Sequence, residues 1–184
     1  TIAMLGLEQI SYVHRKEASD ELLKDVLTSY KQLNKLTLLI NHLLEMRRLE
    51  DGKVPLNKER FNLTEFIQTL VKNTQLLASQ KNIQVTFSGL KTKVINAFTD
   101  KMKLQQVLDN LIHNACKFTP EKGKINIKLS YLAKKKIAYI RINNTGDGIP
   151  SQDLKIIFEK FQQGGRYSKG IGIGLYICRQ YMRL

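Results

Sequence analysis

The sequence predicts an α+β fold, in which a two-layer α/β sandwich follows an antiparallel helical hairpin. Three observations lead to this prediction. Apolar residues recur at helical spacing between residues 22 and 43, helix and strand patterns alternate after residue 61, and 184 residues suffice for one such domain with a helical appendage. We expect the helical hairpin to occupy residues 1–54 and the sandwich to occupy residues 55–184.

The first segment contains a long helix. From Leu22 to Leu43 the apolar or small residues follow one another at alternating steps of four and three, which is a heptad seam. A glycine and a proline soon afterwards end this helix near Glu50. A shorter amphipathic pattern from Ile2 to Val13 predicts a preceding helix, which we expect to be truncated at its start.

The broad apolar stripe of this hairpin requires a packing partner. Two antiparallel helices cannot bury such a stripe by themselves, so we expect a homodimer in which two hairpins form a four-helix bundle. The alternative is a hairpin that packs on its own domain.

The second segment alternates helix and strand. Asn62 or Thr64 can cap its first helix, and Asp100 begins a helix with a clear apolar face. The expected elements are a helix over residues 61–80, strands over 83–87 and 94–97, a helix from 100 to at least 115, strands over 125–129 and 137–142 joined by a lysine-rich turn, a short helix over 154–161 and a final helix from 175. This order gives a mixed sheet with helices on one face and the other face open.

Positive charge is concentrated in the second segment. The chain carries 30 Lys+Arg and 16 Asp+Glu, a net charge of +14. Residues 1–60 hold ten basic and nine acidic residues (+1), so residues 61–184 hold the other twenty and seven (+13). We therefore expect this segment to meet an anion: nucleic acid, a nucleotide, an acidic protein or a membrane surface. The sequence has no apolar run long enough to span a membrane, and its two distant cysteines form neither a disulfide framework nor a zinc motif.

Three polar side chains share one face of the helix that begins at Asp100. Asn110, Asn114 and Lys117 are spaced at i, i+4 and i+7. Amide oxygens coordinate Mg²⁺ and an ammonium group neutralises phosphate, so this face suits a cluster of phosphate and Mg²⁺.

A second motif, residues 144–150, directly follows a predicted strand. Gly146 and Gly148 allow the backbone to pass close to a planar ligand, and Asn144 offers an amide at the end of the strand.

A third motif opens the final helix and contains Gly170, Gly172 and Gly174. Backbone N–H groups freed by glycines, together with the helix dipole, favour a phosphate site. Taken alone, this glycine loop is a weak signal for nucleotide binding.

In this order and spacing, the motifs closely resemble the ATP-binding domain of sensor histidine kinases. The segment "KLQQVLDNLIHNACKFTP" resembles their N box, "NNTGDGIP" the G1 box, "IFEKF" the F box and "GIGIGL" the G2 box. The helix from Leu22 to Glu50 resembles the second helix of their dimerisation domain. The resemblance implies the Bergerat, or GHKL-type, ATP-binding fold with a helical hairpin that dimerises.

The resemblance also implies roles for the motif residues. They are Mg²⁺ coordination by Asn114 with support from Asn110, phosphate binding by Lys117, an adenine pocket shaped by Gly146 and Gly148, and a phosphate lid containing Gly170, Gly172 and Gly174. Asn144 stands where the family usually has an aspartate that accepts a hydrogen bond from the adenine amino group. An amide carbonyl accepts that bond without charge assistance, which predicts weaker ATP binding.

The activity implied by the resemblance is phosphoryl transfer from Mg-ATP to a histidine of the dimerisation hairpin, and then to an aspartate of a response-regulator receiver domain. We expect the acceptor histidine upstream of Thr1, because His14 lies near the predicted turn without an adjacent acid. We also expect further strands beyond Leu184. The expected setting is cytoplasmic, with membrane attachment only through upstream segments.

Three alternatives remain open from the sequence. GHKL-type ATPases place a general-base glutamate four residues before the Mg²⁺-binding asparagine, where this chain has Asn110, an amide that cannot take a proton from water. A non-catalytic nucleotide-binding or dimerisation module is the second alternative. Nucleic-acid binding is the third; only the charge suggests it, and no recognition helix or stacking motif supports it.

Overall fold

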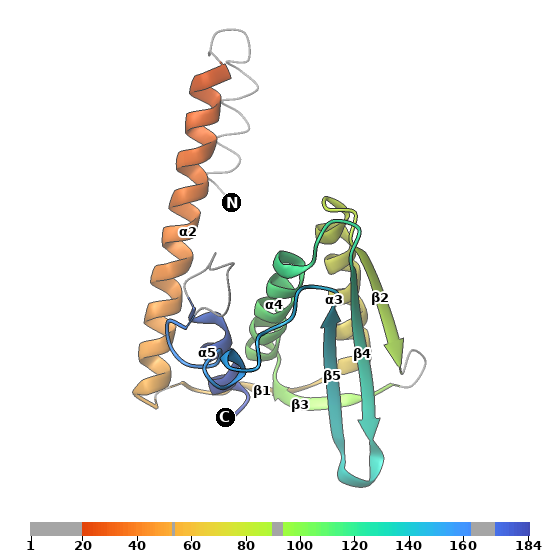
Figure 1. Ribbon diagram of the computed structural model, residues 1–184. Helices are drawn as coiled ribbons and strands as arrows, with labels where there is room; N and C mark the ends of the chain where they lie inside the picture. The colour runs from red at the N-terminus through yellow and green to blue at the C-terminus, as the bar shows by residue number, and fades with distance from the viewer. Residues whose placement is uncertain (1–19, 53, 90–93, 163–171) are drawn as a thin grey trace. The chain divides into compact units, whose positions relative to one another are not determined.

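The structure is a computed structural model that describes residues 20–52, 54–89, 94–162 and 172–184 (Figure 1). By its internal contacts the chain divides into two compact units, with the boundary between Glu45 and Met46. The described part of the first unit consists of helix α2, Asp20–Glu50, which continues across that boundary into the second unit. The functional boundary that we place after residue 54 stays a prediction.

Helix α2 keeps the apolar side chains of its predicted heptad seam largely exposed. Leu22, Leu33, Leu36 and Ile40 are between 48% and 62% exposed. Helix α2 confirms the long helix predicted from the sequence. Because its apolar seam is exposed, the seam is available to pack against other helices. The preceding helix predicted over residues 2–13 lies outside the described residues, and the homodimer stays a prediction.

The second unit contains two small sheets. Strand β1, Lys58–Asn62, pairs antiparallel with β3, Asn96–Asp100. The larger sheet has the order β2-β4-β5, in which β4, Lys124–Leu132, pairs in parallel with β2, Gln84–Gly89, and antiparallel with β5, Ile137–Asn144. The 3₁₀ turn Ala133–Lys135 joins β4 to β5, as the lysine-rich turn of the sequence predicts.

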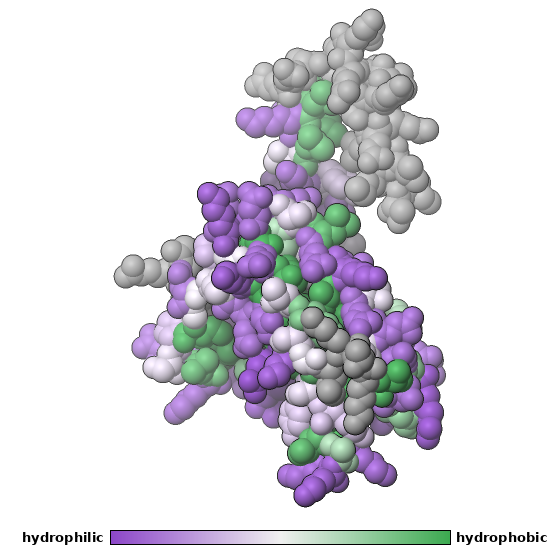
Figure 2. Space-filling model, turned by 90° about the vertical axis from the view of Figure 1, so that its right-hand side faces the viewer, coloured by the Kyte–Doolittle hydropathy of each residue, from purple (hydrophilic) through white to green (hydrophobic). Residues whose placement is uncertain are grey.

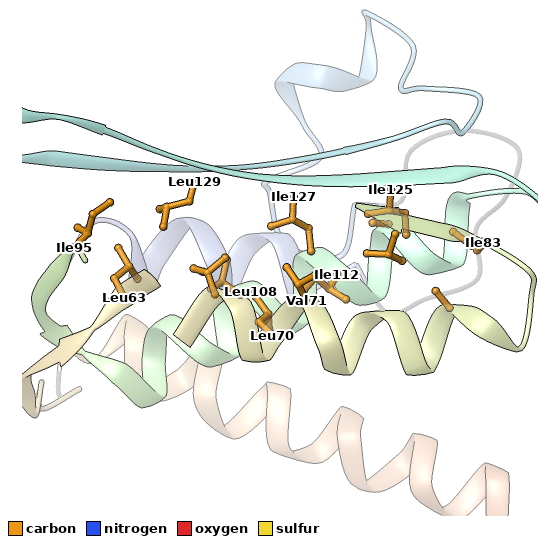
Figure 3. Packing of buried hydrophobic residues seen from close by; sticks show 14 residues of the cluster. Leu63, Leu70, Val71, Ile83, Ile95, Leu108, Ile112, Ile125, Ile127 and Leu129 are labelled. Atoms are coloured by element: carbon orange, nitrogen blue, oxygen red, sulfur yellow. The ribbon is translucent and has the colours of Figure 1, made fainter. Parts of the chain in front are cut away.

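Two helices cover one face of the larger sheet (Figure 1). They are α3, Leu63–Ser79, and α4, Lys101–Phe118. Figure 3 shows Ile125, Ile127 and Leu129 of β4 pointing from the strand toward these helices, and all three are fully buried. Apolar side chains of both helices complete the core, among them Leu70, Val71, Leu108 and Ile112. This arrangement confirms the predicted two-layer α/β sandwich with one open sheet face.

Side-chain caps fix where the two helices begin. The Asn62 side chain accepts a hydrogen bond from the Glu65 backbone N–H at 3.1 Å, so it caps α3 as predicted. The Asp100 carboxylate caps α4 by accepting from the Lys103 backbone N–H at 2.9 Å, and its second oxygen accepts from the Asn57 N–H at 2.9 Å. Asp100 therefore ties the start of α4 to the segment that precedes β1.

One prediction about local structure is wrong, and one strand has no counterpart in the prediction. The short helix predicted over residues 154–161 is a single 3₁₀ turn, Asp153–Lys155, followed by irregular turns in which Phe161 adopts a φ of 61°. Its apolar residues lie too close together in the sequence to distinguish a helix from a packed loop. Strand β1 has no sequence signal, because its first three residues are exposed and only Phe61 and Asn62 are partly buried, so apolar and polar residues do not alternate. Its partner β3 also lies far along the chain.

Helix α5, Gly174–Tyr181, begins where the final helix was predicted. Tyr176, Ile177, Cys178 and Tyr181 are buried, and the helix packs beside α4. Among the described residues, no helix is long and apolar enough to cross a membrane.

Asp100 supplies a test of this packing. Asp100→Ala should lower the free energy of unfolding by about 2 kcal/mol, because both the helix cap and the bond to the Asn57 N–H are lost. Chemical denaturation at neutral pH measures this change. Glu59→Gln, on an exposed part of β1, is the control and should change stability by less than about 0.5 kcal/mol.

The same carboxyl makes stability depend on pH. Burial raises the pKa of Asp100, but hydrogen bonds from the Lys103 and Asn57 backbone N–H groups and the Lys103 charge outweigh it and leave the pKa below its usual value. The stabilisation is therefore present above the unfolded pKa of about 3.9 and is lost as pH falls through the folded pKa. The stability difference between the wild type and Asp100→Asn should shrink below about pH 4; a constant difference would contradict this assignment.

Candidate functional site

Helix α4 divides into an apolar face and a polar face. Leu108, Ile112 and Ala115 are buried against the sheet and α3, and this fixes the rotation of the helix. Asn110, Asn114 and Lys117 are each half-buried on the remaining surface. The three polar side chains predicted from spacing therefore share one side of α4, as the 3.6-residue period requires.

Asn110 lies against the start of α5. A Cβ atom at Gly174 would be 3.2 Å from the Asn110 Oδ1 atom, so only a glycine leaves this oxygen uncrowded. The Asn110 side chain also hydrogen-bonds the thiol of Cys178, and that thiol donates to the Val107 carbonyl at 3.6 Å. Asn110 on α4 thus contacts two residues of α5, both more than sixty positions further along the sequence.

Burial sets the chemistry of that thiol. It raises the pKa of Cys178 to about 11, and the hydrogen bond with Asn110 opposes this rise only in part. Cys178 therefore stays protonated at neutral pH and serves as a hydrogen-bonding partner. The sequence gives no signal for this role of Cys178, because one cysteine among the apolar positions of a helix resembles any other core residue.

Gly146 lies against the other end of α4. A Cβ atom at this position would be 2.3 Å from the Phe118 carbonyl oxygen and 2.9 Å from the Asn144 Nδ2 atom, distances that no side chain tolerates. Gly148 has a φ of +75° and no neighbour within 4 Å of an added Cβ. The first glycine thus permits a close approach between two backbones, and the second permits a left-handed turn.

Thr145 fixes the loop that carries these glycines. Its backbone N–H donates to the Lys124 carbonyl at 3.0 Å, and its hydroxyl accepts from the Lys124 N–H at 2.8 Å. These bonds extend the β4–β5 pairing by one residue beyond Asn144. Sequence reasoning missed Thr145, because its role depends on the register of the two strands.

The third motif is described only at its end. Gly172 has a φ of +75°, and an added Cβ would be 2.6 Å from the Gln162 carbonyl oxygen. Gly172 and Gln162 are therefore in contact. Two residues further on, Gly174 lies beside the Asn110 side chain. Gly170 lies outside the described residues.

The three motifs meet along one helix. Gly174 lies beside Asn110, Gly146 lies beside Phe118, and Asn114 lies halfway between them on α4. Asn110 and Phe118 are eight positions apart, so at a rise of 1.5 Å per residue they lie about 12 Å apart along the helix axis. The Lys117 Nζ atom adds a positive charge at this end, 4.6 Å from the centroid of the Phe118 ring.

This donor set is suited to a particular kind of metal site. No group of three or more His, Cys, Asp or Glu side chains that could hold a metal is found in the part of the chain that the structure describes. The polar face of α4 offers neutral amide oxygens instead. Such a face fits a hard divalent cation whose other ligands come from a phosphate and from water.

None of the three histidines belongs to the trio Asn110, Asn114 and Lys117. His42 is half-buried on α2; burial lowers its pKa, and the charge of Glu45 partly opposes that shift. His113 is exposed on α4, between the core face and the polar face. His14 lies outside the described residues.

Comparison with known proteins agrees with the motifs. Residues 99–184 match the family of histidine kinase-, DNA gyrase B- and HSP90-like ATPases. Histidine kinase P4 of Formosa agariphila is 32% identical over all of this chain, and the sensor histidine kinase TmoS of Ectopseudomonas mendocina is 33% identical over 83% of it. The chain spans only 14% and 16% of these relatives.

Solved structures show the same fold. The catalytic domain of histidine kinase ThkA is 28% identical, with a TM-score of 0.60 over 69% of this chain and 80% of that one. ThkA in complex with the response regulator TrrA, 23% identical, has a TM-score of 0.68 over 96% of this chain and 49% of that one. The chain therefore belongs to the histidine kinase family of two-component signal transduction, and residues 99–184 are the part that matches the ATPase family.

The packing of Gly146 can be tested by adding one methyl group. Gly146→Ala should lower the free energy of unfolding by about 2–3 kcal/mol, because the new Cβ clashes with the Phe118 carbonyl and forces the backbone apart. Gly148→Ala is the matched control. It should cost only about 1 kcal/mol, the penalty of a positive φ in open space. Equal losses in urea denaturation would show that the close approach does not exist.

Proposed function

We propose that this chain is the kinase core of a sensor histidine kinase, which binds Mg-ATP and transfers its γ-phosphoryl group to a histidine. The observation that carries the proposal is the meeting of three motifs along the polar face of α4. Each motif alone is weak, but three observations support reading them together: Gly174 lies beside the Asn110 side chain, Gly146 lies beside the Phe118 carbonyl, and Asn114 and Lys117 lie between these two contacts on α4. The same surface lies within residues matched to the ATPase family.

Each residue has a proposed part in holding the nucleotide. Asn114, supported by Asn110, supplies amide oxygen to Mg²⁺, which neutralises phosphate charge when it is bound. Lys117 supplies a positive charge for the phosphates. The loop of Gly146 and Gly148 faces adenine, and Asn144 accepts a hydrogen bond from its amino group. Gly170, Gly172 and Gly174 offer backbone N–H groups to the phosphates.

The proposed reaction moves one phosphoryl group. A histidine nitrogen forms a bond to the γ-phosphorus while the bond from phosphorus to the β–γ bridging oxygen breaks, and ADP leaves. The protein contributes positioning and charge neutralisation. The phosphoryl group then passes to an aspartate of a response regulator; the complex of ThkA with TrrA supports this partner class.

The helical unit has a proposed role in the same reaction. The exposed seam of α2 supports a homodimer whose bundle carries the acceptor histidine, which we place upstream of Thr1. The proposed setting is the cytoplasmic side of the membrane, where ATP and a response regulator are available.

The surroundings of Asn110 disfavour hydrolysis of ATP by water. A GHKL-type ATPase needs a general base at this position, and Asn110 is an amide engaged with Cys178. Phosphorylation with labelled ATP distinguishes a kinase from a non-catalytic module of the same fold.

Phosphorylation with γ-labelled ATP and Mg²⁺ tests the proposal. A form extended upstream through the preceding helix should acquire an acid-labile phosphohistidine, whereas residues 1–184 alone should bind ATP without labelling. In the extended form, Asn114→Ala should reduce labelling at least tenfold, since the proposed metal ligand is lost. The control Asn73→Ala, which truncates an exposed asparagine on α3, should label normally.

Two results would contradict the proposal. Stable label on His14 would show that the acceptor lies within this chain. Failure of both forms to bind ATP would favour a non-catalytic module that no longer binds the nucleotide.

Adenine recognition by Asn144 gives a second test. Asn144→Asp should tighten ATP binding about fivefold, because a carboxylate accepts the adenine hydrogen bond with charge assistance. Isothermal titration with Mg-ATP and Mg-GTP measures this, and only the ATP affinity should rise. Asn143→Asp adds the same charge to the neighbouring exposed residue and is the matched control. Equal effects of the two substitutions would remove Asn144 from the adenine site.

A further inference from the structure

The open face of the β2-β4-β5 sheet is the second polar surface of the catalytic unit. Along β4, the buried residues Ile125, Ile127 and Leu129 alternate with residues that face the other way. Lys128, Ser130 and their partners on β5 form this outer face, and within the described part of the second unit no helix covers it (Figure 1). The proposed nucleotide site lies on the helix side, so the two surfaces can be occupied independently.

A shallow hollow lies on this face. It is lined by Lys128, Ser130, Tyr139 and Arg141. In the strand register Lys128 lies directly opposite Arg141, and Ser130 lies opposite Tyr139. Like charges placed directly opposite across two strands repel each other. An anionic group bound between the two cations would turn this repulsion into attraction.

The whole hairpin lacks negative charge. Between Lys124 and Asn144 there are five lysines and one arginine and no aspartate or glutamate. Within the described part of the chain, neither Lys128 nor Arg141 forms an ion pair. Among the described residues, the positive charges of Lys128 and Arg141 therefore have no opposite charge paired with them.

Apolar and aromatic side chains lie beside the cations. Leu132 and Ile137 are paired across the strands next to the hollow and are 41% and 42% exposed, and Tyr139 is 50% exposed. At the lower end of Figure 2, where this hairpin turns, hydrophobic side chains lie between hydrophilic ones. Tyrosine and arginine beside an apolar patch with a charged rim are the composition of a protein interface.

We propose that this face, defined by Lys128, Tyr139, Arg141, Leu132 and Ile137, docks an acidic protein surface. Carboxylates of the partner pair with Lys128 and Arg141, and an apolar side chain packs on Tyr139 and the Leu132–Ile137 pair. Tyr139 is the one aromatic side chain among the four residues that line the hollow, which disfavours base stacking, so nucleic acid fits less well. This docking surface does not depend on the proposed kinase activity.

Binding of a fluorescein-labelled peptide of alternating glutamate and tyrosine, followed by anisotropy at fixed ionic strength, tests the docking surface. The double substitution Lys128→Glu with Arg141→Glu should weaken binding at least tenfold. Lys72→Glu with Lys122→Glu makes the same charge change at exposed sites away from the face and should weaken it no more than twofold. Tyr139→Ala leaves the charge unchanged and should weaken binding at least threefold.

Three results would overturn the proposal. Equal losses from both double substitutions would show non-specific attraction to positive charge. An unchanged affinity of Tyr139→Ala would exclude packing on the apolar part of the face. Tighter binding of phosphatidylserine vesicles or duplex DNA than of the peptide, with the same dependence on Lys128 and Arg141, would assign the face to a membrane or to nucleic acid. Thermal melting and Mg-ATP binding, which should match the wild type, verify that each variant is folded.

Discussion

The burial of one face of helix α4 is the constraint on which the rest of the catalytic unit depends. Leu108, Ile112 and Ala115 can be removed from water only by packing on the sheet and α3, and this packing leaves Asn110 and Asn114 on the opposite side. The capping carboxylate of Asp100 determines where the helix begins, so it also sets the position of each later turn. The position of the polar face therefore follows from ordinary core packing.

Glycines then allow other segments to reach this helix. Gly146 brings the loop after β5 onto the Phe118 carbonyl, and Gly174 brings the start of α5 onto Asn110. Both contacts need a missing side chain, since a Cβ would crowd the backbone in the first case and the amide oxygen in the second. Gly146 and Gly174 therefore serve contact with α4, in addition to the proposed contact with a ligand.

Much of this fold could be predicted from the sequence, because its signals are local. The caps at Asn62 and Asp100, the alternating strands and the period of α4 each depend on a few neighbouring residues. Strand β1, the bonds of Thr145 and the contact between Asn110 and Cys178 could not be predicted, because each requires a partner distant in the sequence. The predicted helix over residues 154–161 failed for the related reason that a short apolar run does not specify its own geometry.

Hydrogen–deuterium exchange with and without Mg²⁺ and a non-hydrolysable ATP analogue tests most directly whether the three motifs form one site. We expect slower exchange in three separate segments, residues 110–118, 144–148 and 172–174, with little change at residues 128–141 on the open sheet face. Protection confined to one or two of the three segments would contradict a single nucleotide site built along α4.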